Sequence, residues 1–322
     1  MHAVTARGRW IWAASGLATA VVLAVPGVHL LSQPVLNHQT GVPFATVTRS
    51  FRVPDAITRL TVQSQNGPVT VRAGSGPGVQ VTEQISYDRS GGAPQPRVQR
   101  LVSGGRLTLA DPACAAGDCG VAYNVTVPAS VFTTASSGGG QVSVTGVAGA
   151  DVDSGGGPVT VSQISGPVTV STGGGGLQLD GLTGALHADT GGGPVSATGV
   201  SGAAVIATDG GSLSVRGLNQ QLQADSGGGP VSLTNITAGA VTVITGGGSA
   251  RLVFAAAPQS VSLFTDGGPA ALDVPGGPYA LNTDSDGGPV SVHTATSPSA
   301  TRTLNVSSGG GSLTIGPGGP GR

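Results

Sequence analysis

The sequence predicts an all-β protein, a parallel β-solenoid (β-helix) with coils of about 18 residues and two strands each, preceded by an N-terminal transmembrane helix or signal segment. Three observations predict this architecture. A glycine-rich turn recurs at nearly constant spacing, apolar and polar residues alternate between the turns, and one long uncharged segment lies near the amino terminus.

The recurring turn reads SGGGPVTV at 154–161, TGGGPVSA at 190–197 and SGGGPVSL at 226–233. The Ser or Thr before each glycine cluster recurs in steps of 17, 18, 18, 18, 18, 19, 20, 20 and 23 residues, at Ser137, Ser154, Thr172, Thr190, Thr208, Ser226, Thr245, Thr265, Ser285 and Ser308. Such a period is typical of a solenoid in which each repeat is one coil. A meander of antiparallel hairpins is the rival arrangement, but identical side chains in identical phase favour parallel stacking.

Each coil contains two short strands. In one coil the apolar residues are Val159, Val161, Ile164, Val168 and Val170. Offsets of two within a segment indicate β-alternation, and the longer offsets indicate turns. One corner is therefore expected near 164–166 and the other at the glycine cluster.

The glycine clusters predict a tight corner, because a coil must reverse there through positive φ or close backbone approach. The proline after the cluster is expected to start a strand, and the preceding Ser or Thr to point inward as part of a stacked ladder of hydroxyls. These structural turns comprise Gly155, Gly156, Gly157, Pro158, Gly191, Gly192, Gly193, Pro194, Gly227, Gly228, Gly229 and Pro230.

A longer period accompanies the shorter one. Asp153, Asp189 and Asp225 are each 36 residues apart, and the coils between them carry Ser171 and Ala207. Alternation of this kind separates like charges, but it also fits a superhelical turn of twice the length, with four strands. The sequence leaves both readings open, together with the handedness.

The composition excludes several classes of protein. Gly and Pro number 57 and 22, yet the regular aliphatic residues and the net charge of −1 argue against disorder. With 3% aromatic residues the core is expected to be thin and aliphatic. The chain has no Lys, and only Arg216, Arg251 and Arg302 occur between Leu107 and Pro317, so we expect no nucleic-acid partner.

The amino terminus carries Arg7 and Arg9, followed by an uncharged segment at 10–31. A segment of this length spans a bilayer, and the preceding arginines favour a cytoplasmic amino terminus. The protein is therefore expected in the cell membrane, single-pass with an extracytoplasmic C-terminal body, or secreted if the segment is a cleaved signal peptide. A buried core helix is the remaining alternative.

The two cysteines, Cys114 and Cys119, lie between alternating stretches at 101–109 and 121–127. They predict a disulfide at the tip of a β-hairpin, as in an exported protein. Free thiols remain an alternative, and so does a metal site, although two thiolates are too few for zinc.

The sequence predicts no enzyme and no cofactor. The acidic residues Asp153, Asp189 and Asp225 are weak candidates for a cation site, since calcium requires six or more oxygens, and turn formation is the plainer interpretation. His187 and His293 stand without a Ser–His–Asp arrangement. Outward strand positions carry mostly Ser and Thr.

The array SGGGPVTV…SGPVTVSTGGG…DTGGGPVSA, with CGVAYNVTVP at 119–128 and LTVQSQNGPVTV at 60–71, resembles the DUF4097 family of candidate adhesins over about residues 44–316. The resemblance implies a bacterial envelope protein, common in actinobacteria, with a β-solenoid body. It implies no catalytic residues. This chain has GGGP where many members of the family have GSGD. The difference removes acidic residues and so weakens a model in which adhesion depends on bound cations.

The predicted organisation is a membrane anchor or signal segment at 1–33, a linker at 34–43, an N-terminal β region or cap with the hairpin disulfide at 44–130, the Gly-rich solenoid at 131–316 and a tail at 317–322. The expected function is a non-enzymatic cell-surface protein, an adhesin or structural module whose Ser/Thr-lined β faces bind cell-wall glycan or an envelope protein. An extracytoplasmic sensor or envelope-stress component acting through a membrane partner is the alternative, and self-assembly through the solenoid ends is a third hypothesis.

Overall fold

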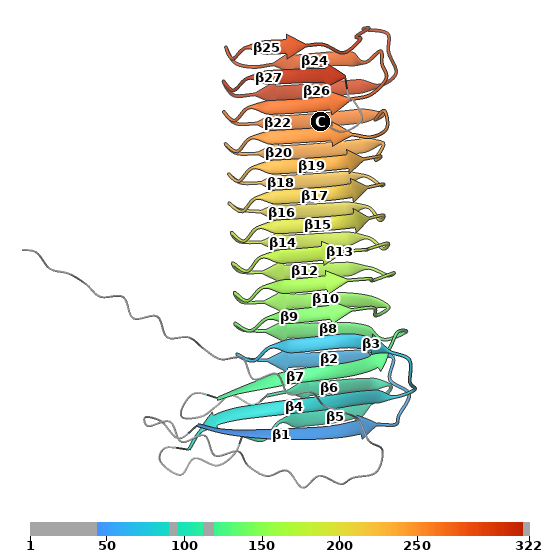
Figure 1. Cartoon of the computed structure of the whole chain (residues 1–322), viewed down its shortest axis with the longest axis vertical. Coiled ribbons are helices and arrows are strands. Elements are labelled where there is room, and N and C mark those ends of the chain that lie inside the picture. Colours follow the sequence, from blue (N-terminus) through green and yellow to red (C-terminus); the bar gives the residue numbers. More distant parts are fainter. Residues whose placement is uncertain (1–43, 90–95, 112–118, 318–322) are drawn as a thin grey trace, which may run out of the picture. The chain divides into compact units, whose positions relative to one another are not determined.

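The computed structural model describes residues 44–89, 96–111 and 119–317, and these form strands and turns without a helix. Their strands make two sheets of 14 and 13 strands, here named sheet A and sheet B. Figure 1 shows the coils stacked one on the next, from β1 and β5 at one end to β24 and β25 at the other. The predicted parallel β-solenoid is confirmed.

In spatial order, sheet A consists of β1 (Phe44–Val53), β4 (Val79–Asp88), β7 (Cys119–Pro128), β3 (Val69–Gly74), β9 (Val142–Thr145), β11 (Val159–Ser162), β13 (Leu177–Asp180), β15 (Val195–Val200), β17 (Leu213–Leu218), β19 (Val231–Ile236), β21 (Ala250–Phe254), β23 (Ala270–Val274), β27 (Leu313–Pro317) and β25 (Val290–Val292). Sheet B consists of β24 (Ala280–Asp284), β26 (Thr303–Ser308), β22 (Ser260–Thr265), β20 (Ala240–Thr245), β18 (Leu222–Ser226), β16 (Ala204–Thr208), β14 (Leu186–Thr190), β12 (Val168–Thr172), β10 (Gly149–Ser154), β8 (Phe132–Ser137), β2 (Arg59–Ser64), β6 (Arg106–Ala110) and β5 (Gln99–Ser103).

Successive coils pair in parallel, each shifted by one repeat of the sequence. Val159 lies opposite Leu177, which lies opposite Val195 in sheet A, and Val168 lies opposite Leu186 in sheet B. One coil of two strands is therefore a full turn of the stack. This register decides against the longer, four-stranded turn that the sequence left open.

The core lies between the two sheets and is one residue layer deep on each side. Its members are mostly Val, Leu, Ile and Ala, and they run as ladders of like side chains through the stack. Among the described residues, the buried core runs from Val53 to Ile315, within the compact unit Gln39–Arg322. We call this unit the solenoid body, and it contains the buried apolar surface needed to fold without the residues before it.

The corner with the glycine clusters is closed by backbone approach. A Cβ at Gly157 would lie 2.2 Å from the carbonyl oxygen of Gly140, and one at Gly193 would lie 2.1 Å from that of Gly175. Neither glycine has a positive φ. Only a residue without a side chain fits where two coils touch through their main chains. Pro158, Pro194 and Pro230 each directly precede a strand of sheet A.

Positive φ is used at the other corner, near the predicted 164–166 turn. One residue per coil has this conformation there, at Gly146, Gln163, Gly181, Gly199, Gly217 and Asn235. Asn is among the residues that tolerate it best, and Gly has no Cβ to clash. The two corners therefore need glycine for different reasons.

At the N-terminal end the sequence order and the spatial order differ. β2 and β3 pair with β8 and β9, while β6 and β7 lie outside them. The parallel pairing between strands therefore continues across residue 130, where the sequence predicted the boundary between the cap and the solenoid. β1 pairs antiparallel with β4, and β4 antiparallel with β7, so these strands close sheet A at this end.

The expected hairpin between 101–109 and 121–127 is wrong, because β6 lies in sheet B and β7 in sheet A. The hairpin that forms joins β5 to β6, with Ser103 opposite Arg106. Gly104 and Gly105 have φ of 57° and 74°, which a tight two-residue turn requires.

At the C-terminal end the last two coils are exchanged. β26 and β27 follow β24 and β25 in the chain, yet they lie between those strands and β22 and β23. Thr265 consequently lies opposite Ser308. If the coils stacked in the order of the sequence, it would lie opposite Ser285, which precedes the next glycine cluster. The short β25 becomes the outermost strand of sheet A, and such a short edge limits pairing with other chains.

The predicted membrane segment at 10–31 and the linker at 34–43 lie outside the described residues. Among the residues that are described, no helix is long and apolar enough to cross a membrane.

Candidate functional site

A ladder of buried hydroxyls lies along the glycine corner. Its members are Ser64, Ser137, Ser154, Thr172, Thr190, Thr208, Ser226, Thr245, Thr265 and Ser308. Thr190 shows the pattern: its Oγ1 accepts from the Gly193 N–H at 3.0 Å and donates to the Gly175 carbonyl of the preceding coil at 3.3 Å. The hydroxyl thus serves backbone groups that the tight corner leaves unpaired.

We expect Thr190→Val to lower the free energy of unfolding by about 2 kcal/mol, because a buried N–H and a buried carbonyl lose their partner. Chemical denaturation followed by circular dichroism measures this. Thr190→Ser retains the hydroxyl and should recover most of the loss. The exposed Thr198→Val is the matched control, with a change within about 0.5 kcal/mol; equal losses in the two valine variants would contradict the role.

The outer face of sheet A carries a column of uncharged polar side chains. Its members lie in register on neighbouring strands, one per coil, and form what we call the hydroxyl column: Thr70, Ser143, Thr160, Gln178, Ser196, Ser214 and Ser232. The column stops at Arg251, which forms an ion pair with Asp273 at 2.7 Å. Adjacent members are about 4.8 Å apart, the spacing of the strands.

The structure does not bring the candidate cation ligands together. Asp153, Asp189 and Asp225 lie in one outward column of sheet B, with Ser171 and Ala207 between them. Neighbouring carboxylates are thus about two strand spacings apart, too far to share a calcium ion. In the described ranges, no group of three or more His, Cys, Asp or Glu side chains is placed to hold a metal.

Cys119 begins β7 and packs against the core, while Cys114 lies outside the described residues, so the disulfide stays a prediction. His187 is exposed on β14. Sequence reasoning missed a contact between Ser291 Oγ and His293 Nε2, 2.8 Å apart and exposed. No described carboxylate hydrogen-bonds to this imidazole, so the pair lacks the group that orients a catalytic histidine.

The N-terminal end contains a buried ion pair that the sequence analysis also missed. Glu83 is fully buried, and Arg100 reaches it from the other sheet through Nε to Oε1 at 2.9 Å and through Nη2 to Oε2. The hydrogen bond to Glu83 raises the pKa of Arg100. The Arg100 guanidinium also lies 4.5 Å from the centre of the Phe51 ring. The signal was present, since Glu83 occupies an inward position in the alternation of 79–87.

Tyr123 lies opposite Glu83 in the same layer. Its hydroxyl is buried without a hydrogen-bond partner among the described residues. Burial raises its pKa, and the charges of Asp111 and Glu83 add to this. Burial likewise raises the pKa of Asp111, whose carboxylate accepts from the Gln65 N–H. The Glu83 carboxylate and the Tyr123 hydroxyl are closed to solvent at this end of the stack, whereas Asp111 is partly exposed.

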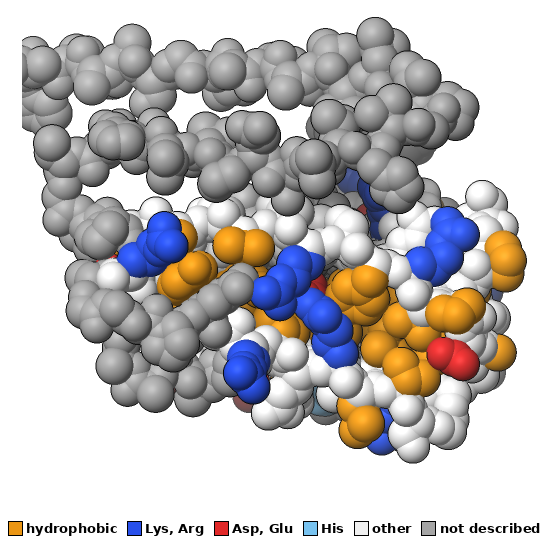
Figure 2. All heavy atoms as spheres, turned by 90° about the horizontal axis from the view of Figure 1, so that it is seen from below, with side chains coloured by type: hydrophobic (Ala, Val, Ile, Leu, Met, Phe, Trp, Pro, Cys, Tyr) orange, Lys and Arg blue, Asp and Glu red, His pale blue; other side chains and the backbone are white. Residues whose placement is uncertain are grey.

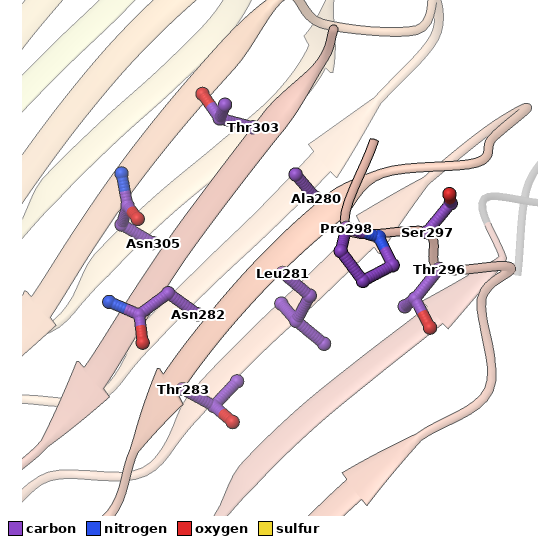
Figure 3. A pocket seen from close by; sticks show the side chains of 9 residues that line it. All are labelled: Ala280, Leu281, Asn282, Thr283, Thr296, Ser297, Pro298, Thr303 and Asn305. Carbon is purple, nitrogen blue, oxygen red and sulfur yellow. The ribbon is translucent and has the colours of Figure 1, made fainter. Parts of the chain in front are cut away.

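A hollow of about 470 Å³ lies at the C-terminal end, where β24 is the outermost strand of sheet B. The Tyr279 N–H donates to Ala295 and the Tyr279 carbonyl accepts from Ser297, but Pro298 has no N–H to continue the pairing. Figure 3 shows the hollow between β24 and the segment at 296–298, with Asn282 beside Asn305. None of its lining residues is titratable, so it offers no general acid or base.

A scan against protein-family models gave no match, and a search of curated proteins gave none either. A candidate adhesin from Bacteroides fragilis is similar in structure, with 11% identity, 84% of this chain and 96% of the other covered, and a TM-score of 0.39. A candidate cell adhesion protein from Clostridium sporogenes has 11% identity, coverage of 84% and 98%, and a TM-score of 0.21. Likeness this distant says nothing of function, and the resemblance to the DUF4097 family stays a prediction.

Proposed function

We propose that the protein is a non-enzymatic module of the bacterial cell surface that binds neutral cell-wall glycan, as an adhesin does. The observation that carries this proposal is the hydroxyl column of sheet A, which runs from β3 to β19 without a charged residue. A polymer with regularly repeated hydroxyl groups is the ligand class that such a column suits.

The hydroxyl column offers a ligand many weak hydrogen bonds, one at each coil. Each exposed hydroxyl exchanges a hydrogen bond to water for one to ligand, which is worth about 1 kcal/mol. A chain that spans several coils makes its later contacts intramolecularly, so affinity grows with the number of coils engaged. The same surface offers little to a single sugar, because no exposed aromatic side chain belongs to the column.

The experiment measures binding of the solenoid body to purified cell wall by sedimentation, and to soluble N-acetylglucosamine oligomers of increasing length by calorimetry. We expect saturable wall binding and an affinity that rises with oligomer length. The triple variant Ser196→Val, Ser214→Val and Ser232→Val should weaken wall binding at least about tenfold, since three hydrogen bonds are lost. Valine suits a strand, so the fold is retained.

Thr169→Val with Ser171→Val on the outer face of sheet B is the matched control and should leave wall binding unchanged. Absence of wall binding would overturn the proposal. Capture of one membrane protein by the body, without wall binding, would instead favour the sensor.

A further inference from the structure

Formal charge is separated along the solenoid body. Residues 44–111 contain eight arginines and four acidic residues, a charge of +4, whereas residues 119–317 contain three arginines and ten acidic residues, a charge of −7. The whole-chain charge of −1 hides this separation.

The positive charge lies at the N-terminal end of the stack. Arg49 and Arg52 belong to β1 and Arg100 to β5, which are the outermost strands there, and Arg97 directly precedes β5. Figure 2 looks onto this end and shows arginine side chains spread over it among apolar ones, with few acidic side chains in view. Arg52 and Arg97 are exposed and form no ion pair with a described residue.

Large apolar side chains are exposed on the same two strands. Phe44 on β1 is 56% exposed, and Leu101 and Val102 on β5 are 63% and 43% exposed. Arginines interspersed with exposed Phe, Leu and Val are the composition of a surface that lies in the interface of an anionic bilayer.

The sequence that precedes the first strand of the body indicates that a membrane is what this end contacts. The body's first strand begins with Phe44 at the edge of sheet A, and only the short segment 32–43 separates it from the uncharged segment 10–31. Fully extended, a segment of that length reaches at most about 40 Å. If segment 10–31 enters a bilayer, the N-terminal end is the part of the body that is held beside the headgroups.

We propose that the N-terminal end of the solenoid binds an anionic lipid surface, with Arg52 and Arg97 at the headgroup phosphates and Phe44 and Leu101 in the interface. This inference does not depend on glycan binding, and its test does not depend on whether segment 10–31 is an anchor. With this end on the membrane, the hydroxyl column lies along the side of the stack and extends away from the membrane, from β3 to β19.

The test uses the solenoid body, residues 39–322, which lacks segment 10–31. Its partitioning is measured by cosedimentation with vesicles of phosphatidylglycerol mixed with phosphatidylcholine and with vesicles of phosphatidylcholine alone. We expect binding to the anionic vesicles only, and loss of binding at high salt because exposed charges are screened. Arg52→Gln and Arg97→Gln should each lower the partition coefficient about fivefold, and Phe44→Ser should lower it further.

Arg216→Gln is the matched control, because Arg216 is exposed on β17 in the middle of the stack, and it should not change the partition coefficient. Equal binding to neutral vesicles, no vesicle binding, or an equal effect of Arg216→Gln would overturn the proposal. Two further outcomes would do the same: saturable binding of soluble polyphosphate without a preference for vesicles, and association of the positive end with the negative end of a second copy in sedimentation experiments.

Discussion

Gly193→Ala is expected to lower the free energy of unfolding by about 3 kcal/mol, a loss similar to that caused by adding a side chain to a fully packed core. The added Cβ would lie 2.1 Å from the carbonyl oxygen of Gly175 and 2.5 Å from its carbonyl carbon. These atoms belong to the main chain of the neighbouring coil, so no side chain can turn aside and the coils must separate locally. Chemical denaturation measures the total loss, and amide hydrogen exchange at 186–195 shows whether it is local, as in other repeat proteins.

Gly192→Ala is the matched control one residue away. Its Cβ would meet nothing within 4 Å, and its φ is not positive. We expect no loss, and a gain of about 0.5 kcal/mol because alanine restricts the unfolded chain. If both variants lose the same stability, the glycines act through chain flexibility and not through contact between coils.

Arg100→Ala is expected to cost about 3 kcal/mol, since breaking a buried pair by removing one partner leaves an uncompensated charge buried. The substitution deprives the Glu83 carboxylate, whose side chain is 0% exposed, of its two hydrogen bonds from Arg100. We place the effect at the lower end of the range for such pairs because the Arg100 side chain is 35% exposed. Thermal and chemical denaturation both report it.

The double variant Glu83→Gln with Arg100→Ala separates charge from packing. A neutral amide is less costly to bury than a carboxylate, so the double variant should be more stable than Arg100→Ala alone. Arg106→Ala is the control on the next strand, exposed and without an ion pair to a described residue, and it should change stability little. A double variant less stable than the single one would show that the loss in Arg100→Ala does not come from an unpaired carboxylate.

The site residues were predictable to different degrees. The alternation of Ser, Thr and Val predicted that the side chains of the hydroxyl column face outward and that the hydroxyls at the glycine corner face inward. This follows because successive side chains of a strand lie on opposite faces. The same rule pointed Glu83 inward, but its partner Arg100 lies 17 residues away on the other sheet. A contact between sheets depends on which coils stack, and single-residue patterns carry no information about that.

The sequence by itself determined the repeat length, the inward and outward faces and the uneven distribution of charge, whereas the pairing of successive coils decided that two strands make one full turn. The repeat length and the faces follow from local periodicity, which every coil repeats. Only the tertiary structure decided that the corner glycines serve close contact between backbones, that β26 and β27 insert beneath β24 and β25, and that β6 and β7 belong to different sheets. Each of these depends on pairing between segments that are distant in the chain. The strands are so alike that several of them could pair equally well by local pattern, and the choice is made only when the complete stack forms.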